Sequence, residues 1–238
     1  MKEYKTISGE RKNPFSRTSK MPWLSFNLPA SKCKTGSTLD NDPESPCYHE
    51  TCYAKNRRYT MPSVQEACEQ NYENLENKGW KEAFVIALVD AKNKVIKNKK
   101  KTNFFRWFDS GDIQNEEHLE NMVYVAEEIP NIRFWLSTHE FDIINKYVAS
   151  GKTIPKNLKI RVSDKHLDQE RNEYQNEIDV LNKLPNVLCQ IGTAGVSKDP
   201  GKITCISSQQ DNKCFGDKKE CADCWLDSNN NRQVYKEK

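Results

Sequence analysis

Short apolar segments alternate with longer amphipathic segments along most of the 238-residue chain. The short segments are rich in aromatic and β-branched residues, as strands are, whereas the longer ones repeat their apolar residues at helical spacing. Strands separated by helices pair in parallel, because each helix returns the chain to the same end of the sheet. The sequence therefore predicts an α/β fold, either an open parallel sheet or a partial (β/α) barrel. We expect strands over residues 23–28, 104–108, 132–136, 158–162 and 186–191.

Helices are expected between these strands, and several carry start and stop signals. Pro62 suits the first turn of a helix, and Gly79 and Gly151 suit positions just after one. The regular pattern ends after Gly195, so the chain divides into a polar arm over 1–20, an α/β core over 21–197 and an irregular cysteine-rich tail over 198–238. The expected helices cover 62–79, 80–95, 115–129, 141–148 and 170–184.

Composition narrows the class of protein. The chain has 36% hydrophobic and 30% charged residues and a net charge of +3, which does not by itself indicate a nucleic-acid partner. The basic run over 97–101 is either a solvated helix end or a patch that contacts phosphate. No apolar stretch approaches the roughly 20 residues needed to span a bilayer, and the first 20 residues lack the apolar run of a signal peptide. We expect a cytoplasmic protein without a membrane partner.

Nine cysteines are many for such a chain. In a reducing compartment thiols rarely pair as disulfides, so clustered cysteines there indicate metal ligands. The tail contains a Cys-x2-Cys pair and two further cysteines, which suit tetrahedral zinc or a four-iron cluster equally well. The predicted tail ligands are Cys205, Cys214, Cys221 and Cys224.

A second group of cysteines, Cys33, Cys47 and Cys52, follows the first predicted strand. Three thiolates without an obvious fourth suit a [4Fe-4S] cluster that leaves one iron open to a ligand. We expect His49 to be a solvated loop residue, although as a fourth ligand it would suit zinc. A ligand from the tail would also complete the set. The two remaining cysteines, Cys68 and Cys189, are expected to be small buried hydrophobes.

Polar residues follow the predicted strands in register with the first cysteine group. In parallel sheets and barrels the loops after the strands open onto one crevice, where ligands bind. These residues are also common turn formers, and His139 and Glu140 suit either acid–base chemistry or a helix start. A buried Arg106 would need Asp109, Asp112 or an anionic ligand as its partner. The candidate ligand-binding residues are Arg106, Asp109, Ser110, Gly111, Asp112, His139, Glu140, Arg161 and Ser163.

Several stretches together resemble the phage gene product 88 family, whose function is poorly defined. They are MPWLSFNLPASKCKTG over 21–36, CYA over 52–54, FRWFDSGDIQ over 105–114, IRFWLSTHE over 132–140, LKIRVS over 158–163, and the tail through Cys224 and Trp225.

A looser resemblance is to radical S-adenosylmethionine enzymes, which place three cysteines after the first strand of a partial (β/α) barrel. In those enzymes a Gly-Gly-Glu-like turn after the second strand holds the methionyl amine of the cofactor, and Ser110, Gly111 and Asp112 stand in that place here. This chain departs from their compact Cys-x3-Cys-x2-Cys loop, because four residues separate Cys47 from Cys52 and Cys33 lies well before both. The resemblance implies a cluster site and leaves radical chemistry open.

Three functions follow as expectations. The first is an iron–sulfur protein with a radical S-adenosylmethionine-like core, one or two [4Fe-4S] clusters and an unknown substrate. The second is a non-catalytic electron-transfer or structural iron–sulfur protein. The third is a zinc-stabilised binding module, for which the basic run gives a weak case for nucleic acid.

Overall fold

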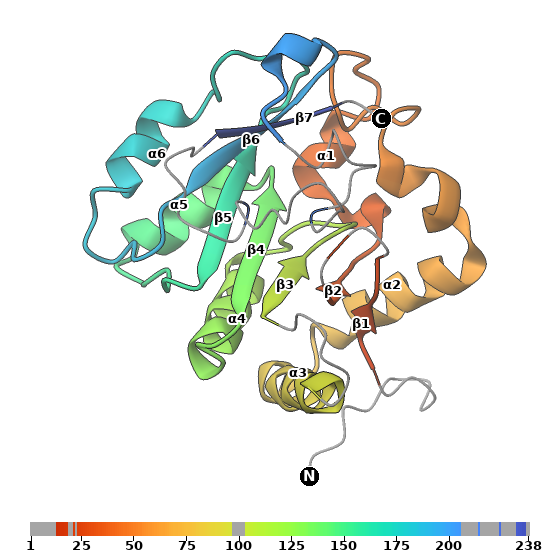
Figure 1. Ribbon diagram of the computed structural model, residues 1–238, viewed down its shortest axis with the longest axis vertical. Coiled ribbons are helices and arrows are strands. Elements are labelled where there is room, and N and C mark those ends of the chain that lie inside the picture. Colours follow the sequence, from red (N-terminus) through yellow and green to blue (C-terminus); the bar gives the residue numbers. More distant parts are fainter. Residues whose placement is uncertain are drawn as a thin grey trace.

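The structure is a computed structural model, shown in Figure 1. It describes residues 13–18, 21, 23–96, 103–205, 214, 224 and 232–236. The basic run over 97–101, Cys221 and most of the polar arm lie outside the described residues. No helix in the described part of the chain has the length and apolar character to cross a membrane.

The described strands form one seven-stranded sheet in which each strand pairs with the next along the chain. The first pair is antiparallel and all the others are parallel, which confirms the predicted α/β class with a mostly parallel sheet. The strands are β1 (Phe15–Ser16), β2 (Ser25–Phe26), β3 (Phe104–Trp107), β4 (Arg133–Thr138), β5 (Leu158–Ser163), β6 (Gly192–Ser197) and β7 (Arg232–Lys236).

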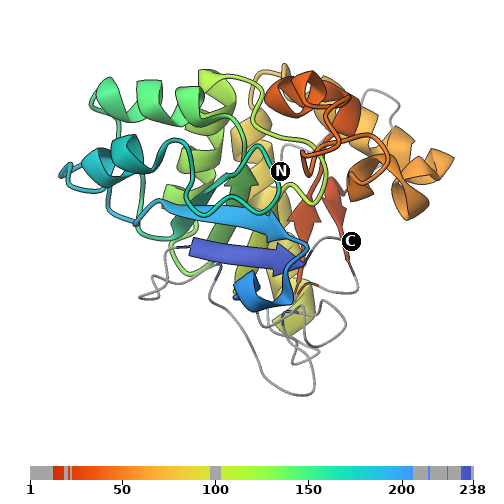
Figure 2. The same cartoon turned by 90° about the horizontal axis from the view of Figure 1, so that it is seen from above.

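Sequential pairing places the crossover helices on one side of the sheet, since parallel crossovers are almost always right-handed. Figure 2 shows α4, α5 and α6 together above the strands. Asn115 caps α4, because its side-chain oxygen accepts a hydrogen bond from the His118 backbone at 2.8 Å. The helices are α1 (Lys34–Thr38), α2 (Pro62–Asn74), α3 (Trp80–Ile96), α4 (Glu116–Glu128), α5 (Phe141–Ala149) and α6 (Gln175–Leu181), with 3-10 turns η1 (Ala30–Lys32), η2 (Tyr53–Lys55), η3 (Arg57–Thr60) and η4 (Pro200–Lys202).

The helix-covered face of the sheet holds the main hydrophobic core. Trp107 of β3 stacks on Phe84 of α3 at 5.0 Å between ring centroids and on Phe134 of β4 at 6.0 Å. Phe26 and Phe105 meet Phe84 edge to face. These aromatic pairs stabilise the packing of α3 on β2, β3 and β4, since offset and edge-on ring contacts are favourable beyond the burial of apolar area.

The opposite face of the sheet, which we call the polar face, carries Arg106, Trp135, Lys159 and Arg161. Arg106 and Lys159 both pair in register with Trp135, and side chains of register partners lie on the same side of a sheet. All four side chains are buried. The polar face is therefore covered, although none of the described crossover helices packs on it.

The predicted fifth strand over 186–191 is wrong, because β6 begins at Gly192. Val187 makes only an isolated bridge to Ile154, and Leu188 is 47% exposed. The true strand was missed because its small residues give a weak apolar signal. Gly195 is needed there, since a Cβ would lie 2.6 Å from Asp164 Oδ2 and 3.0 Å from Arg232 Nη2.

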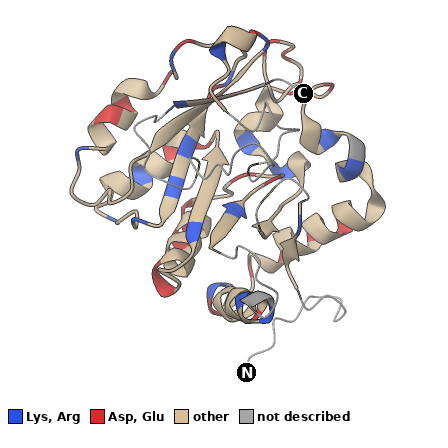
Figure 3. Ribbon diagram, in the orientation of Figure 1, with Lys and Arg blue, Asp and Glu red and all other residues tan. Residues whose placement is uncertain are grey.

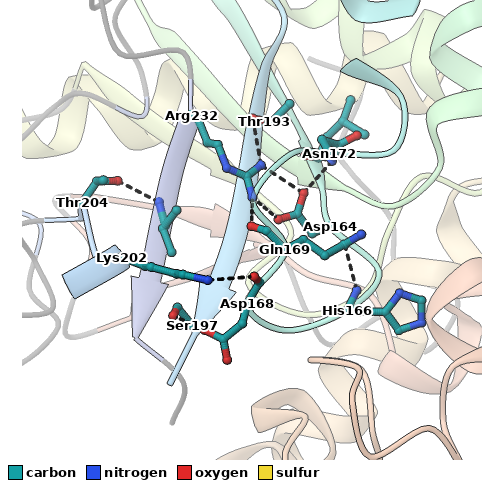
Figure 4. Close-up of polar contacts among 12 residues, drawn as sticks. Asp164, His166, Asp168, Gln169, Asn172, Thr193, Ser197, Lys202, Thr204 and Arg232 are labelled. Carbon is teal, nitrogen blue, oxygen red and sulfur yellow. Dashed lines mark hydrogen bonds and ion pairs between the residues drawn. The ribbon is translucent and has the colours of Figure 1, made fainter. Parts of the chain in front are cut away.

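The expectation that regular structure ends after Gly195 is also wrong, because β7 lies in the tail and joins the sheet beside β6. Arg232 of β7 forms an ion pair with Asp164, and it donates hydrogen bonds to the Gln169 carbonyl at 2.8 Å and to Thr193 Oγ1 at 3.3 Å (Figure 4). Long-range pairing of this kind leaves no local pattern in a sequence.

Three predicted elements are shorter than expected. The strand over 23–28 is only Ser25–Phe26, the helix over 62–79 ends at Asn74, and the helix over 170–184 is only Gln175–Leu181. Cys68 and Cys189 are buried as predicted, at 5% and 2% exposure, although Cys189 lies in a loop and not in a strand.

His118 makes the fold sensitive to acid. Burial lowers its pKa from 6.5 to about 3, so the unfolded chain binds a proton there at a pH where the folded protein does not. Stability from this residue is present above about pH 6.5 and is lost as the pH falls. By linkage the loss reaches ~2 kcal/mol at about pH 5. In urea unfolding, His118→Gln should lose ~2 kcal/mol less than the parent between pH 7 and about pH 5, whereas His49→Gln, at an exposed position, should match the parent. Equal pH slopes in all three proteins would contradict this.

Candidate functional site

A cavity of about 280 Å³ opens at the carboxyl ends of the parallel strands. Seven of the nine candidate ligand-binding residues line it, whereas Glu140 and Arg161 do not. Six of the seven predicted metal ligands also line it, and the seventh, Cys221, is not described. The lining candidates are Arg106, Asp109, Ser110, Gly111, Asp112, His139 and Ser163, with Cys33, Cys47, Cys52, Cys205, Cys214 and Cys224.

The first cysteine group, which we call the front thiols, lies on the loop between β2 and α2. Cys33 ends η1 and precedes α1, and Gly36 brings the two halves of the loop together. A Cβ on Gly36 would lie 3.2 Å from Cys33 Cβ and 3.4 Å from Cys47 Sγ. Cys33 and Cys47 are thus neighbours although thirteen residues lie between them.

Polar residues at the strand ends hold this loop in place. Glu140 accepts hydrogen bonds from the Thr35 backbone at 2.8 Å and from Thr35 Oγ1 at 3.1 Å, two residues after Cys33. His139 Nε2 lies 3.4 Å from Cys47 Sγ. The strand ends therefore contact Cys47 directly and hold Cys33 through Thr35.

The third front thiol, Cys52, is held through its neighbour Tyr53. Arg106 donates a hydrogen bond to the Tyr53 hydroxyl at 3.2 Å, and its Nη1 lies 2.6 Å from Asp109 Oδ1. Tyr59 also donates to Asp109. Asp109 is thus one of the two carboxylate partners predicted for Arg106. Burial would lower the pKa of Arg106, but the Asp109 carboxylate beside it raises the pKa above its usual range.

Asp112 is a buried carboxyl group that faces the front thiols. Burial raises its pKa to about 7, and hydrogen bonds from Thr138 Oγ1 at 2.5 Å and the His139 backbone at 2.9 Å oppose that rise. Near neutral pH this carboxyl group therefore occurs both in its protonated form, which can donate a proton, and in its ionised form, which can accept one.

Two of the front thiols, Cys33 and Cys47, are neutral near pH 7. Burial raises the pKa of Cys33 well above its usual range and that of Cys47 to about 12, and the charges of Asp112 and Cys52 raise both further. A metal that binds them must replace their protons.

Of the two histidines near the front thiols, His49 is an exposed loop residue, as expected, whereas the position of His139 was not anticipated. The Nδ1 atom of His49 lies 2.8 Å from the Asp40 carbonyl, which belongs to the same loop. His139 approaches a front thiol instead, and its Nδ1 is buried with no hydrogen-bond partner among the described residues. Burial lowers the pKa of His139 to about 4, so the ring is neutral.

The tail cysteines Cys205, Cys214 and Cys224 are 5%, 9% and 5% exposed and form the other wall of the cavity. Among the described residues, no three Cys, His, Asp or Glu side chains are grouped so as to hold a single metal ion.

Sequence reasoning missed four residues that build the site: Thr35, Tyr53, Tyr59 and Tyr235. Tyr235 lies 3.1 Å from Cys224 through its hydroxyl. Of these four, only Tyr53 could have been found from the sequence, because it directly follows the predicted metal ligand Cys52. The others act through contacts between distant parts of the chain.

Gly111 is required at the turn between β3 and α4. It has a φ of +87°, and a Cβ would lie 2.5 Å from Leu28 Cβ and 2.9 Å from the Leu28 carbonyl oxygen. We expect Gly111→Ala to cost at least ~3 kcal/mol of unfolding free energy through overpacking and backbone strain. Gly151→Ala should cost only ~1 kcal/mol, because Gly151 has a similar φ of +82° but open space around it. Equal losses in chemical denaturation would refute this reading of the turn.

The chain was compared with known families, curated proteins and solved structures. The model of the family described as Gene product 88 matches residues 2–227. No curated protein and no solved structure matches. The match covers most of the chain and includes all six described cysteines of the cavity, and the chain therefore belongs to the Gene product 88 family.

Proposed function

We propose that this protein binds a [4Fe-4S] cluster through Cys33, Cys47 and Cys52. The observation that carries the proposal is that all three thiols line one cavity at the carboxyl ends of the strands, where the charges of Cys47 and Cys52 both act on Cys33. Thiolates are the usual ligands of iron–sulfur clusters. A cluster takes one thiolate at each iron, so its ligands surround a volume and need not converge on a point.

Three thiolates leave one iron open toward the cavity. At about 280 Å³, the cavity is near the lower end of ligand-pocket sizes, which start at about 300 Å³. A small molecule beside the open iron would meet Ser110, Gly111 and Asp112. If this turn acts as its counterpart does in radical S-adenosylmethionine enzymes, the methionyl amine of that cofactor would lie beside it, and an ionised Asp112 would pair with the ammonium group.

When bound, a reduced cluster of this kind supplies one electron to its ligand. The residues of this chain would position that ligand. Glu140 and Arg106 hold the thiol loop through Thr35 and Tyr53, and the buried Trp135 and Phe108 reduce the access of water to the cavity. We therefore propose a radical S-adenosylmethionine-like iron–sulfur protein whose substrate is unknown.

One observation favours zinc instead. Cys47 Sγ and His139 Nε2 lie 3.4 Å apart, and two such ligands of one tetrahedral zinc ion would be separated by roughly 3.6 Å. A zinc-stabilised binding module is the second candidate function, and metal analysis separates it from the first.

The first test is the metal content of protein purified without oxygen. Iron and acid-labile sulfide should be present, and Cys33→Ala, Cys47→Ala and Cys52→Ala should each lower both. Cys189→Ala removes a buried thiol away from the cavity and should leave the metal content unchanged. Unchanged iron in all three front variants would defeat the proposal, and stoichiometric zinc without sulfide would favour the second candidate.

The second test is binding of S-adenosylmethionine to the iron-loaded protein, measured by equilibrium dialysis. Asp112→Asn should weaken binding about tenfold, or ~1.4 kcal/mol, because it removes the carboxylate that faces the amine. Asp142→Asn, an exposed position in the first turn of α5, is the matched control. If the iron-loaded parent neither binds the cofactor nor releases 5′-deoxyadenosine after reduction, the cluster serves electron transfer alone.

A further inference from the structure

The three described tail cysteines form a second set of thiols, separate in sequence from the front thiols. Cys214 and Cys224 pack against Trp135 on the polar face of the sheet. Cys205 is fixed by a hydrogen bond from its backbone amide to the Val234 carbonyl at 3.0 Å, and Cys224 lies beside the Tyr235 hydroxyl. The strand β7 thus connects this thiol set to the sheet.

Buried cations share this face with the tail thiols. Arg106 lies over the Trp135 ring at 4.6 Å, and the charge of Cys214 acts on it. Arg161 is fully buried on β5 and lies close enough to Tyr235 to act on its hydroxyl. Figure 3 shows Lys and Arg segments on the central strands of the sheet. A cationic surrounding favours an anionic occupant, and an iron–sulfur cluster with its thiolates is anionic.

Carboxyl groups dominate the surroundings of the front thiols, although the ammonium group of Lys55 also acts on Cys47. Asp112 and Glu140 are buried carboxyl groups, and both act on Cys33. Negative charge near a cluster stabilises its oxidised form, and positive charge or a hydrogen bond to a cluster ligand stabilises its reduced form. The same kind of cluster would therefore have different reduction potentials in the two places.

We propose that Cys205, Cys214 and Cys224 hold a second iron–sulfur cluster on the polar face, and that Arg161 and Tyr235 give it a higher reduction potential than the front cluster. The second cluster does not require the front one, but the comparison of potentials rests on the proposed function. Arg161 and Tyr235 are positioning residues, since they act on the cluster through its thiols and its electrostatic surroundings.

The experiment uses two full-length triple variants reconstituted with iron and sulfide. One carries Cys33→Ala, Cys47→Ala and Cys52→Ala, and the other carries Cys205→Ala, Cys214→Ala and Cys224→Ala. Each should retain about half of the iron of the parent. In a potentiometric titration followed by electron paramagnetic resonance, the protein that keeps the tail thiols should be reduced at the higher potential.

Point variants then test the source of the difference. In the protein that keeps the tail thiols, Arg161→Gln should lower the potential, and so should Tyr235→Phe, which keeps the ring but removes the hydroxyl beside Cys224. Arg133→Gln, an exposed position on β4, should leave it unchanged. In the protein that keeps the front thiols, none of these changes should shift the potential. If Arg161→Gln does not fold, the reduction potential of Tyr235→Phe still tests whether this group of residues raises the potential.

The outcomes separate the two proposals. If the variant without front thiols loses all its iron while the other keeps it, the second cluster is refuted and the proposed function stands. If the variant without tail thiols loses all its iron while the other keeps it, the front cluster is refuted and the second cluster stands. Equal potentials, or a lower potential at the tail thiols, would overturn the assigned roles of Arg161 and Tyr235.

Discussion

Sequential pairing of parallel strands is the constraint on which the rest of this structure depends. Because every strand from β2 to β7 pairs with the next along the chain, right-handed crossovers bring α4, α5 and α6 to one face. The opposite face receives none of the crossover helices in the described part of the chain and is covered in another way. Here the segments that carry the cysteines reach it, and the cavity lies where they meet the carboxyl ends of the strands.

Burial of charge on the polar face has a further consequence. Arg106 is buried beside Asp109, and removing one member of such a pair leaves the other charged and unpaired, which typically costs 3–5 kcal/mol. Tyr53 and Tyr59 complete the group by hydrogen bonding to the pair. The ion pair thus serves two purposes, since it satisfies a buried arginine and also anchors the loop that carries Cys52. A change at Arg106 would alter stability and the thiol site together.

Within one cavity the chain places thiols beside carboxyl groups on one side and beside guanidinium groups on the other. Asp112 and Glu140 lie near Cys33, and Arg106 lies near Cys214. Such an arrangement gives chemically identical ligands different properties, because long-range electrostatic interactions are weakly screened in a buried site. This asymmetry is what makes two centres with distinct roles a physical possibility in so small a domain.

The sequence by itself determined the α/β class, the strands near β3, β4 and β5, the burial of Cys68 and Cys189, and the choice of Asp109 or Asp112 as partner of Arg106. Each of these follows from local periodicity or from the cost of burying a charge. Only the tertiary structure decided that β7 completes the sheet, that β6 lies at 192–197, and that His139 rather than His49 approaches a front thiol. Those features depend on contacts between residues far apart in the chain, such as Arg232 with Asp164, and local sequence patterns carry no record of such contacts.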